Sequence, residues 1–227
     1  MMAFHERLTA ATAAEEDDFV NIPLIKQALR DGVPKDMYLA YLEQAYHHVK
    51  HTCHLLALAA SRCGDGDAGY QEALFEYINE EKGHDEWILD DIAALGGDAG
   101  AVRKGEPDIP CAVMVGYTYY AIEHISPYCL LGMVHVLEGM SVLLAGKAAA
   151  SIRRTIGDGD DVGGFTYLAS HGEIDIQHVA FFKKTIETIS DAEKQKAVIE
   201  TARVIYRLFG DIFRSLGKNL EGNQNAA

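Results

Sequence analysis

Carboxylate and imidazole side chains at helical spacing are the residues of this sequence most able to do chemistry. Glu81 and His84 are three residues apart, which places them on one face of a helix. His171, Asp175 and His178 follow one another at spacings of four and three, so they share a helix face in the same way. The two segments therefore supply two sets of candidate metal ligands.

A single carboxylate, Glu138, lies in the most apolar stretch of the chain, residues 129–150. A carboxylate that is buried there must be ion-paired, protonated or bound to a cation. His135, one helical turn earlier, is the nearest local partner. A hydrogen bond between Glu138 and His135 is therefore the structural alternative to a metal site.

Taken together, these residues match the way helical bundles build a two-metal carboxylate site. Carboxylates bridge and neutralise the two ions, imidazoles fix each ion, and open coordination positions admit O₂. Iron or manganese suits this mixed nitrogen and oxygen donor set better than zinc, which favours four ligands in closed sites. The alternative is a solvated charged face at residues 80–82 and histidines that only pack.

Further histidines lie in the segment YHHVKHTCH, residues 46–54. His47, His51 and His54 share one helix face at spacings of four and three. His47 or His51 is expected either to complete the metal site or to hydrogen-bond its ligands from outside.

Helices must position all of these residues, because apolar positions recur at helical spacing and strand-like alternation is absent. Pro127 should restart a helix, Gly157 should end one, and Ser190 to Glu193 has the pattern of a capping box. The sequence predicts one all-α domain over residues 1–227, a bundle of seven or eight helices with a frayed tail from about residue 220. The expected helices cover residues 34–63, 70–95, 111–127, 128–156, 171–190 and 190–219, with an acidic turn at 158–161.

Composition limits the partners. The chain has 20 Lys and Arg against 34 Asp and Glu, a formal charge of −14, which disfavours nucleic acid and anionic membranes. The first residues mix both charges and lack an apolar segment, so we expect no signal peptide and a cytoplasmic location. The four cysteines form no C-x-x-C pair, so neither a disulfide framework nor a zinc ribbon is indicated.

At these residues the sequence resembles the heme-oxygenase-like superfamily, which includes thiaminase II, pyrroloquinoline-quinone synthase and diiron oxidases. The likeness is greatest to the para-aminobenzoate-synthesising diiron branch, which has a Glu-Glu pair, a His and a Trp on one long helix. Here Glu80-Glu81, His84 and Trp87 stand in that order. The branch then has a solitary Glu, matched by Glu138, and a His-x-x-x-Asp-x-x-His pattern, matched at residues 171–178.

The resemblance covers essentially the whole chain and implies a heme-oxygenase-like bundle with two iron ions, or manganese in their place. The implied ligands are Glu81, His84, Glu138, His171, Asp175 and His178. The ferrous form would activate O₂ and oxidise a small organic molecule. The oligomeric state typical of the superfamily also implies a homodimer.

Tyrosines are expected to line the substrate pocket. The candidates are Tyr46, Tyr117, Tyr119 and Tyr120, of which Tyr46 and Tyr120 are the predicted catalytic residues. Their rings could relay electrons or be oxidised themselves, as the para-aminobenzoate branch implies. The alternative is core packing at helical spacing.

Other functions remain open from the sequence. A metal-free enzyme similar to thiaminase II or the quinone synthase would use Cys129 as its nucleophile or bind substrate through the histidines. A non-catalytic carrier or regulator would keep only the fold and its pocket. Haem binding would have to use His5, the histidine nearest the N-terminus.

The predicted ligand His171 depends on the backbone at Gly172. If Gly172 ends a helix, His171 becomes a loop ligand or none.

Overall fold

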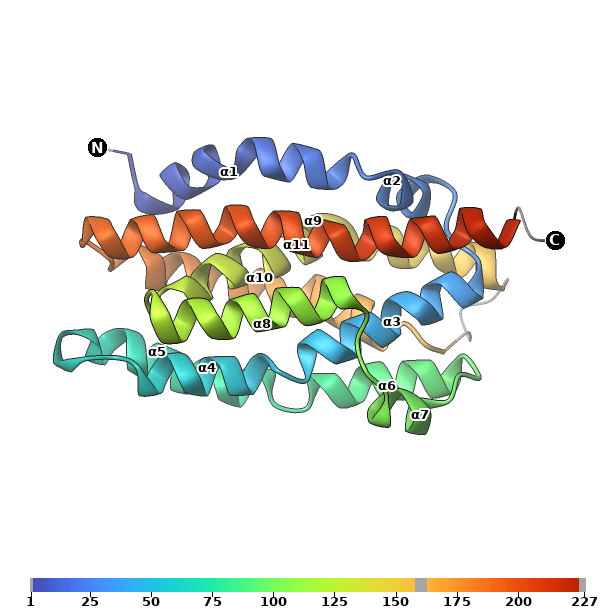
Figure 1. Cartoon of the computed structure of the whole chain (residues 1–227), viewed down its shortest axis with the longest axis horizontal. Helices are drawn as coiled ribbons and strands as arrows, with labels where there is room; N and C mark the ends of the chain where they lie inside the picture. Colours follow the sequence, from blue (N-terminus) through green and yellow to red (C-terminus); the bar gives the residue numbers. More distant parts are fainter. Residues whose placement is uncertain (1, 158–162, 225–227) are drawn as a thin grey trace.

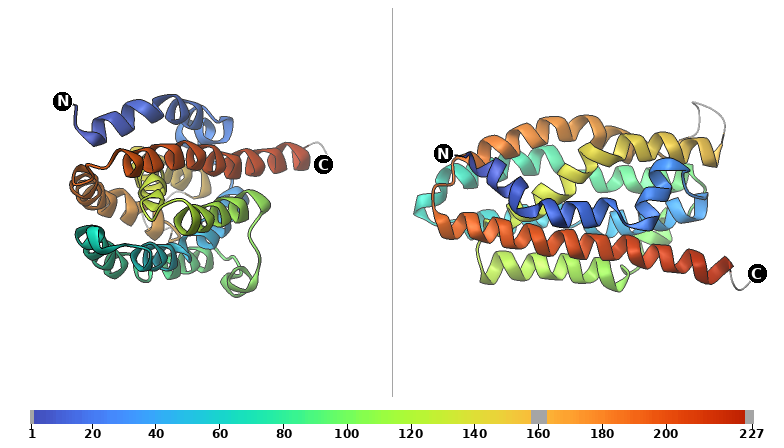
Figure 2. Two further views of the ribbon diagram at one scale, coloured as in Figure 1. Left: turned by 60° about the vertical axis from the view of Figure 1, so that its left-hand side comes forward. Right: turned by 90° about the horizontal axis from the view of Figure 1, so that it is seen from above.

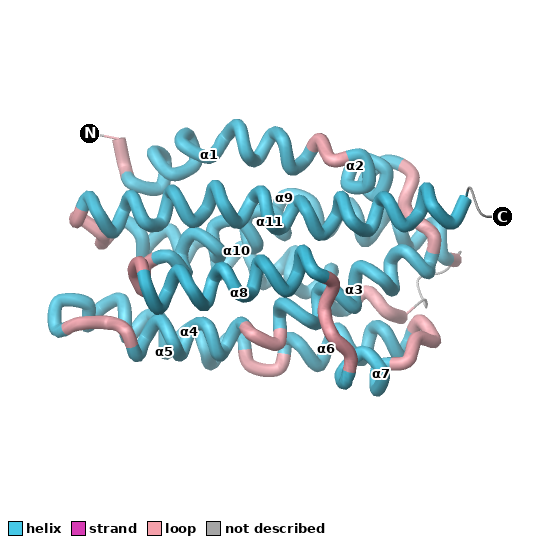
Figure 3. The backbone as a smooth tube through the Cα atoms, viewed as in Figure 1, coloured by secondary structure: helices cyan, strands magenta, loops and turns pink. Residues whose placement is uncertain are grey.

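The computed structural model describes residues 2–157 and 163–224, with the side chains of residues 171–177 and 219–224 outside the described part. Throughout these residues the elements are helices joined by short connections (Figure 3), so the all-α prediction is confirmed. The helices are α1 (Phe4–Val20), α2 (Pro23–Arg30), α3 (Lys35–Val49), α4 (Thr52–Ser61), the 3₁₀ helix η1 (Asp65–Asp67), α5 (Ala68–Glu81), α6 (His84–Ala94), α7 (Ala99–Lys104), α8 (Ile109–His124), α9 (Cys129–Ile156), α10 (Thr166–Glu187) and α11 (Ala192–Gln224).

The helices form layers that run along one long axis (Figure 1). Helices α1 and α2 cover one side of α11, and α4 to α7 form the opposite layer. Helices α9 and α10 lie between these layers, and the left view in Figure 2 keeps this order. Because α9 packs against α8, α10 and α11, side chains from both halves of the chain meet around it.

Helix α9 is the apolar centre of this arrangement. Among the described residues it is the one helix long and apolar enough to cross a membrane, and 56% of that stretch is buried inside the bundle. Glu138 lies near its middle and is 9% exposed. This long apolar helix therefore carries a carboxylate into the hydrophobic core.

Two of the expected long helices are interrupted and the short helix α7 was not expected, so the described part of the chain has eleven α-helices instead of seven or eight. The helix predicted over 34–63 breaks at Lys50 and His51 into α3 and α4. The one predicted over 70–95 breaks at Lys82 and Gly83 into α5 and α6. The breaks between α8 and α9 near Pro127, and after α9 at Gly157, are where the sequence predicts them.

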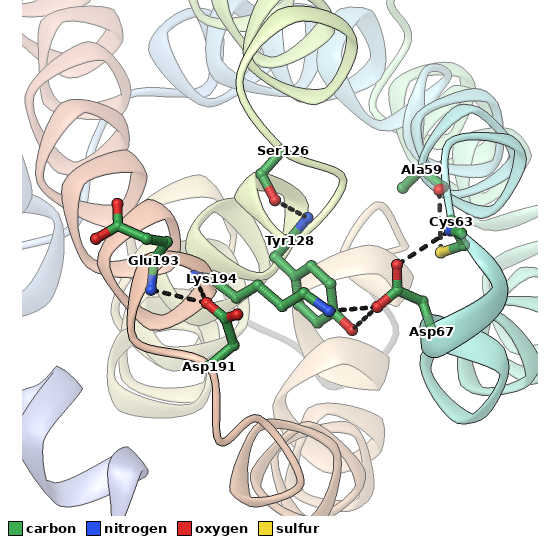
Figure 4. A network of polar contacts seen from close by, with 9 residues as sticks. Ala59, Cys63, Asp67, Ser126, Tyr128, Asp191, Glu193 and Lys194 are labelled. Atoms are coloured by element: carbon green, nitrogen blue, oxygen red, sulfur yellow. Dashed lines mark hydrogen bonds and ion pairs between the residues drawn. The ribbon is translucent and has the colours of Figure 1, made fainter.

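The start of α11 also differs in detail from the prediction. Asp191, and not Ser190, accepts hydrogen bonds from the backbone N–H groups of Glu193 and Lys194, at 2.8 and 3.0 Å. Figure 4 shows this cap beside a second polar contact, in which Lys194 and the hydroxyl of Tyr128 both donate to Asp67. Asp67 therefore ties the connection before α5 to the starts of α9 and α11.

The two remaining predicted boundaries are the start of α10 and the end of α11. Helix α10 begins at Thr166, earlier than predicted, and α11 continues to Gln224. The acidic turn at 158–161 and the last residues of the tail, 225–227, lie outside the described residues.

Candidate metal centre

Glu81 and His84 lie on either side of a helix break. Glu81 is the last residue of α5, and His84 is the first residue of α6. Between them, Gly83 has a φ of +96°, a left-handed conformation that glycine adopts without steric cost. The prediction of one continuous helix is wrong here, yet Glu81 Oε2 lies 3.2 Å from His84 Nδ1. The turn at Lys82 and Gly83, and not the spacing along one helix, therefore brings Glu81 and His84 together.

Two more elements bring side chains to Glu81. Oε1 of Glu81 lies 3.3 Å from Nδ1 of His178 on α10, and the same nitrogen lies 3.6 Å from Oε1 of Glu138 on α9. One ligand atom from each of Glu81, Glu138 and His178 lies within 4.8 Å of the others. Three helices distant in sequence thus place two carboxylates and an imidazole around one point.

Glu80 contacts His178 from the other side. Its Oε2 lies 3.3 Å from His178 Nε2, while Nδ1 faces Glu81 and Glu138. Metal-binding histidines commonly direct their second ring nitrogen at a carboxylate, which fixes the ring and its tautomer. Helical spacing would pair Glu80 with His84, whereas the structure places Glu80 against His178.

Aromatic rings hold both imidazoles in place. Trp87 stacks on His84 with the ring centroids 4.2 Å apart, and Tyr77 meets His178 edge to face at 5.1 Å. The rings of His84 and His178 lie nearly parallel, 6.5 Å apart. Packing of this kind restricts ring rotation, so the nitrogens keep their directions.

A buried carboxylate also connects the helices that carry the two histidines. Asp91 on α6 accepts hydrogen bonds from the backbone N–H groups of Thr166 and Tyr167, at 2.9 and 2.7 Å. These are the first residues of α10, so Asp91 satisfies N–H groups that have no partner within that helix. The cap fixes the position of α10, and hence of His178, relative to α6.

A cavity of about 80 Å³ adjoins the cluster, and we call it the carboxylate cavity. Glu81 and Glu138 border it, together with His48, Tyr77, Tyr167 and mainly apolar side chains. His48 is 5% exposed and lies on α3. It was not among the histidines predicted for the site, although the buried Ala45 lies three residues earlier on the same helix face.

The chemistry of these donors fits a divalent metal. Two carboxylates that share a small apolar space repel each other, and a cation between them removes that repulsion. Imidazole and carboxylate are ligands that iron and manganese accept readily. The pKa of neighbouring His135 is lowered to about 4 by burial, so that imidazole is neutral and supplies no counter-charge.

His135 is not the partner of Glu138 that the sequence offers as an alternative. Its Nε2 lies 3.3 Å from the hydroxyl of Thr12, and its ring packs against Phe182. His5, the candidate haem ligand, also lies against His135 and Phe182. These contacts place both histidines in a cluster of their own between α1, α9 and α10.

The predicted ligands His171 and Asp175 have side chains outside the described residues. The backbone that carries them is described, because α10 is helical from Thr166 to Glu187 and continues through Gly172. The helix therefore does not end at Gly172, and positions 171, 175 and 178 keep the helical spacing on which their prediction depends.

His47 and His51 make contacts away from Glu81 and Glu138. Nδ1 of His47 lies 3.1 Å from Nζ of Lys50, and Nδ1 of His51 lies 3.0 Å from the hydroxyl of Tyr119. Burial and Lys50 lower the pKa of both imidazoles. The α3 histidine that reaches the carboxylate cavity is His48.

The predicted catalytic tyrosines are not brought to the cluster. Tyr120 is 57% exposed and packs against His124 on the surface of α8. Tyr46 packs with Lys50 and His47. The tyrosines that border the carboxylate cavity are Tyr77 and Tyr167, because helices α5 and α10, and not α8, face it.

Cys129, the candidate nucleophile of a metal-free enzyme, is fully buried at the start of α9. Burial raises the pKa of its thiol, which keeps the thiolate population low. The carboxylate cavity is lined by its neighbours Leu130, Met133 and Val134. The environment of Cys129 is that of an inert packing residue.

Solved structures show the same fold. A domain of unknown function with a heme oxygenase-like fold from Shewanella denitrificans superimposes with a TM-score of 0.86 at 20% identity, covering 100% of this chain and 97% of that one. A TenA homologue from Pseudomonas syringae gives a TM-score of 0.80 at 11% identity, with 95% and 93% covered. Heme oxygenase-1 from the cyanobacterium Synechocystis, in complex with heme, gives 0.72 at 12% identity, with 99% and 97% covered. At these identities the likeness establishes the fold alone.

No curated protein sequence matches this chain significantly. A family model does match, over residues 39–210, a range that contains all six candidate diiron ligands. The chain thus belongs to a family described as iron-containing redox enzymes.

Proposed function

We propose that this enzyme is a non-haem diiron oxidase that uses O₂ to oxidise a small organic molecule. The observation that carries the proposal is the meeting of Glu81, Glu138 and His178 beside a small apolar cavity, in a family of iron-containing redox enzymes. The order of the candidate ligands along the chain supports a likeness to the para-aminobenzoate-synthesising branch.

Six residues would hold two iron ions, or two manganese ions in their place: Glu81, His84, Glu138, His171, Asp175 and His178. When bound in the ferrous state, iron supplies the electrons and the open coordination positions that O₂ activation needs.

The chain's own residues prepare the site. Glu81 and Glu138 place two carboxylates against the apolar wall of α9, where weak solvent screening strengthens their attraction for cations. Glu80 orients His178 through Nε2, and Trp87 and Tyr77 fix the two imidazole planes. The substrate would enter beside His48, which borders the same cavity.

Metal retention tests the proposal. Protein purified without oxygen is loaded with ferrous iron, desalted and analysed by plasma mass spectrometry. We expect about two iron ions per chain, as in other two-metal bundle sites. Glu138→Gln removes one anionic ligand and should lose most of the iron.

Glu72→Gln is the matched control, because Glu72 lies on the exposed face of α5 and its loss should leave the iron content unchanged. Well-folded wild-type protein that retains neither iron nor manganese would contradict the proposal.

A further inference from the structure

A second cavity, of about 130 Å³, lies next to the carboxylate cavity, and we call it the apolar chamber. The two share four lining residues: His48, Leu137, Ser141 and Tyr167. The two cavities therefore adjoin at a boundary made by α3, α9 and α10, on the side of Glu138.

Apolar side chains make up nearly the whole wall of the chamber. Helix α2, on the outside of the bundle in Figure 1, contributes the buried Leu24 and Ile25. Helix α11 contributes Phe209 and Phe213, and α9 contributes a row that includes Ala145 and Ala148. No Asp, Glu, Lys or Arg is among the described lining residues.

The tyrosine hydroxyl groups in the chamber already make hydrogen bonds within the protein. Tyr38 donates to the carbonyl of Gly164 at 3.0 Å, and Tyr41 shares a hydrogen bond with Tyr167. Burial raises the pKa of Tyr41 to about 12, so its hydroxyl stays protonated. An ion placed in the chamber would lose its hydration without gaining a counter-charge, at a large free-energy cost.

The volume sets the size of the occupant. An apolar protein cavity of about 150 Å³, lined by Leu, Ile and Phe, stays dry and accepts one benzene molecule. The apolar chamber has a similar volume and a similar lining.

We infer that the apolar chamber binds the uncharged apolar part of the substrate, a group about the size of one six-membered ring. This inference rests on the proposed function, since the shared boundary at His48 and Ser141 would leave the polar end of such a substrate beside Glu138.

Fluorine NMR tests the inference with fluorobenzene as an uncharged probe and 4-fluorobenzoate as its anionic counterpart. We expect fluorobenzene to bind saturably with a dissociation constant of about 1 mM, the range that seven non-hydrogen atoms can reach. At the same concentrations 4-fluorobenzoate should not bind. Equal binding of the two probes would overturn the inference.

Filling the chamber gives the matched comparison. Ala148→Leu adds three carbon atoms to its wall and should weaken fluorobenzene binding at least about tenfold. Ala150→Leu, two residues along α9 on its exposed face, should leave binding unchanged. Ala145→Leu fills the chamber from a buried position one turn earlier and should act like Ala148→Leu. Circular dichroism checks that each variant folds.

Iron content measured on the same samples separates this inference from the proposed function. Protein that retains iron but does not bind fluorobenzene, or whose Ala148→Leu variant binds it as tightly as wild type, would overturn the chamber and leave the oxidase proposal standing. Fluorobenzene binding without iron retention would overturn the oxidase proposal and leave the binding of an apolar group in the chamber standing. Ala148→Leu with wild-type iron and weakened fluorobenzene binding supports both.

Discussion

In two of the segments that supply candidate ligands, a glycine lies between the ligands. The backbone conformation at these two glycines is opposite: one ends a helical stretch and the other continues a helix. Between Glu81 and His84, Gly83 takes a φ of +96° and separates α5 from α6. Between His171 and Asp175, Gly172 continues the helix, since α10 runs from Thr166 to Glu187. One ligand pair is set by a turn, and the other keeps helical spacing.

The surroundings of each glycine explain the difference. Lys82, just before Gly83, is already extended with a ψ of 117°, so α5 has ended before the glycine is reached. Helix α10 begins on the Asp91 cap and packs along α9. Such packing outweighs a helical cost of about 1 kcal/mol for one glycine. A glycine permits a break, but the packing on either side decides whether one occurs.

The largest expected effect concerns the histidines of the two segments. His84→Ala removes the imidazole of the turn, and His178→Ala removes that of α10. We expect each to weaken iron binding more than about 100-fold, beyond the loss found when only an outer partner of a ligand is removed. Equilibrium dialysis against ferrous iron measures the change.

His124→Ala is the control, because His124 is exposed on α8. If only His178→Ala lost iron, His84 would not be a ligand, and of these two histidines only that of α10 would bind iron.

The next effect concerns Glu80, which joins the turn segment to α10 through His178. Without this carboxylate the His178 ring loses a group that fixes its orientation, so Glu80→Ala should weaken iron binding by about 10- to 100-fold. Glu80→Gln keeps an acceptor oxygen and should have a smaller effect. Iron dialysis measures both variants.

Glu76→Ala removes an exposed carboxylate one turn earlier on α5 and should bind iron as wild type does. Wild-type iron affinity in Glu80→Ala would show that His178 keeps its orientation without Glu80.

Much of the fold could be predicted from local signals in the sequence. Pro127, Gly157 and the Gly96-Gly97 pair mark helix ends that the structure has, because each disfavours a continuing helix. The break at Lys50 and His51 has neither proline nor glycine, so no local signal marks it. It depends on how α3 and α4 pack against different neighbours.

The candidate site divides in the same way. Spacing and residue type identified Glu81, His84, Glu138 and His178, which the structure brings together. Spacing could not show which face of α3 turns inward. His47 and His51 were therefore predicted for the site, whereas His48 is the histidine that lines the carboxylate cavity. The contact of Glu80 with His178 and the Asp91 cap join residues 75 or more positions apart, and no pattern within one helix predicts them.

A smaller effect is expected at the turn glycine. Gly83→Ala would force an alanine into a left-handed conformation, at a cost of about 1–2 kcal/mol in the free energy of unfolding. No heavy atom lies within 4 Å of the added Cβ, so the backbone alone accounts for the loss. Urea unfolding measures it.

Gly116→Ala serves as control, since Gly116 lies within α8 and also has nothing within 4 Å of an added Cβ. It should raise stability by about 0.5–1 kcal/mol. Equal stability of Gly83→Ala and wild type would mean that the turn adopts another conformation in solution.

The smallest effect, and the one that most sharpens the comparison, is expected at Gly172. Because α10 is continuous there, Gly172→Ala replaces a helix-interior glycine and should raise the free energy of unfolding by about 0.5–1 kcal/mol. Iron retention should not fall, because positions 171, 175 and 178 keep their spacing. A loss of both stability and iron would instead show that Gly172, like Gly83, requires a conformation that alanine resists, and His171 would then leave the helix face it shares with Asp175 and His178.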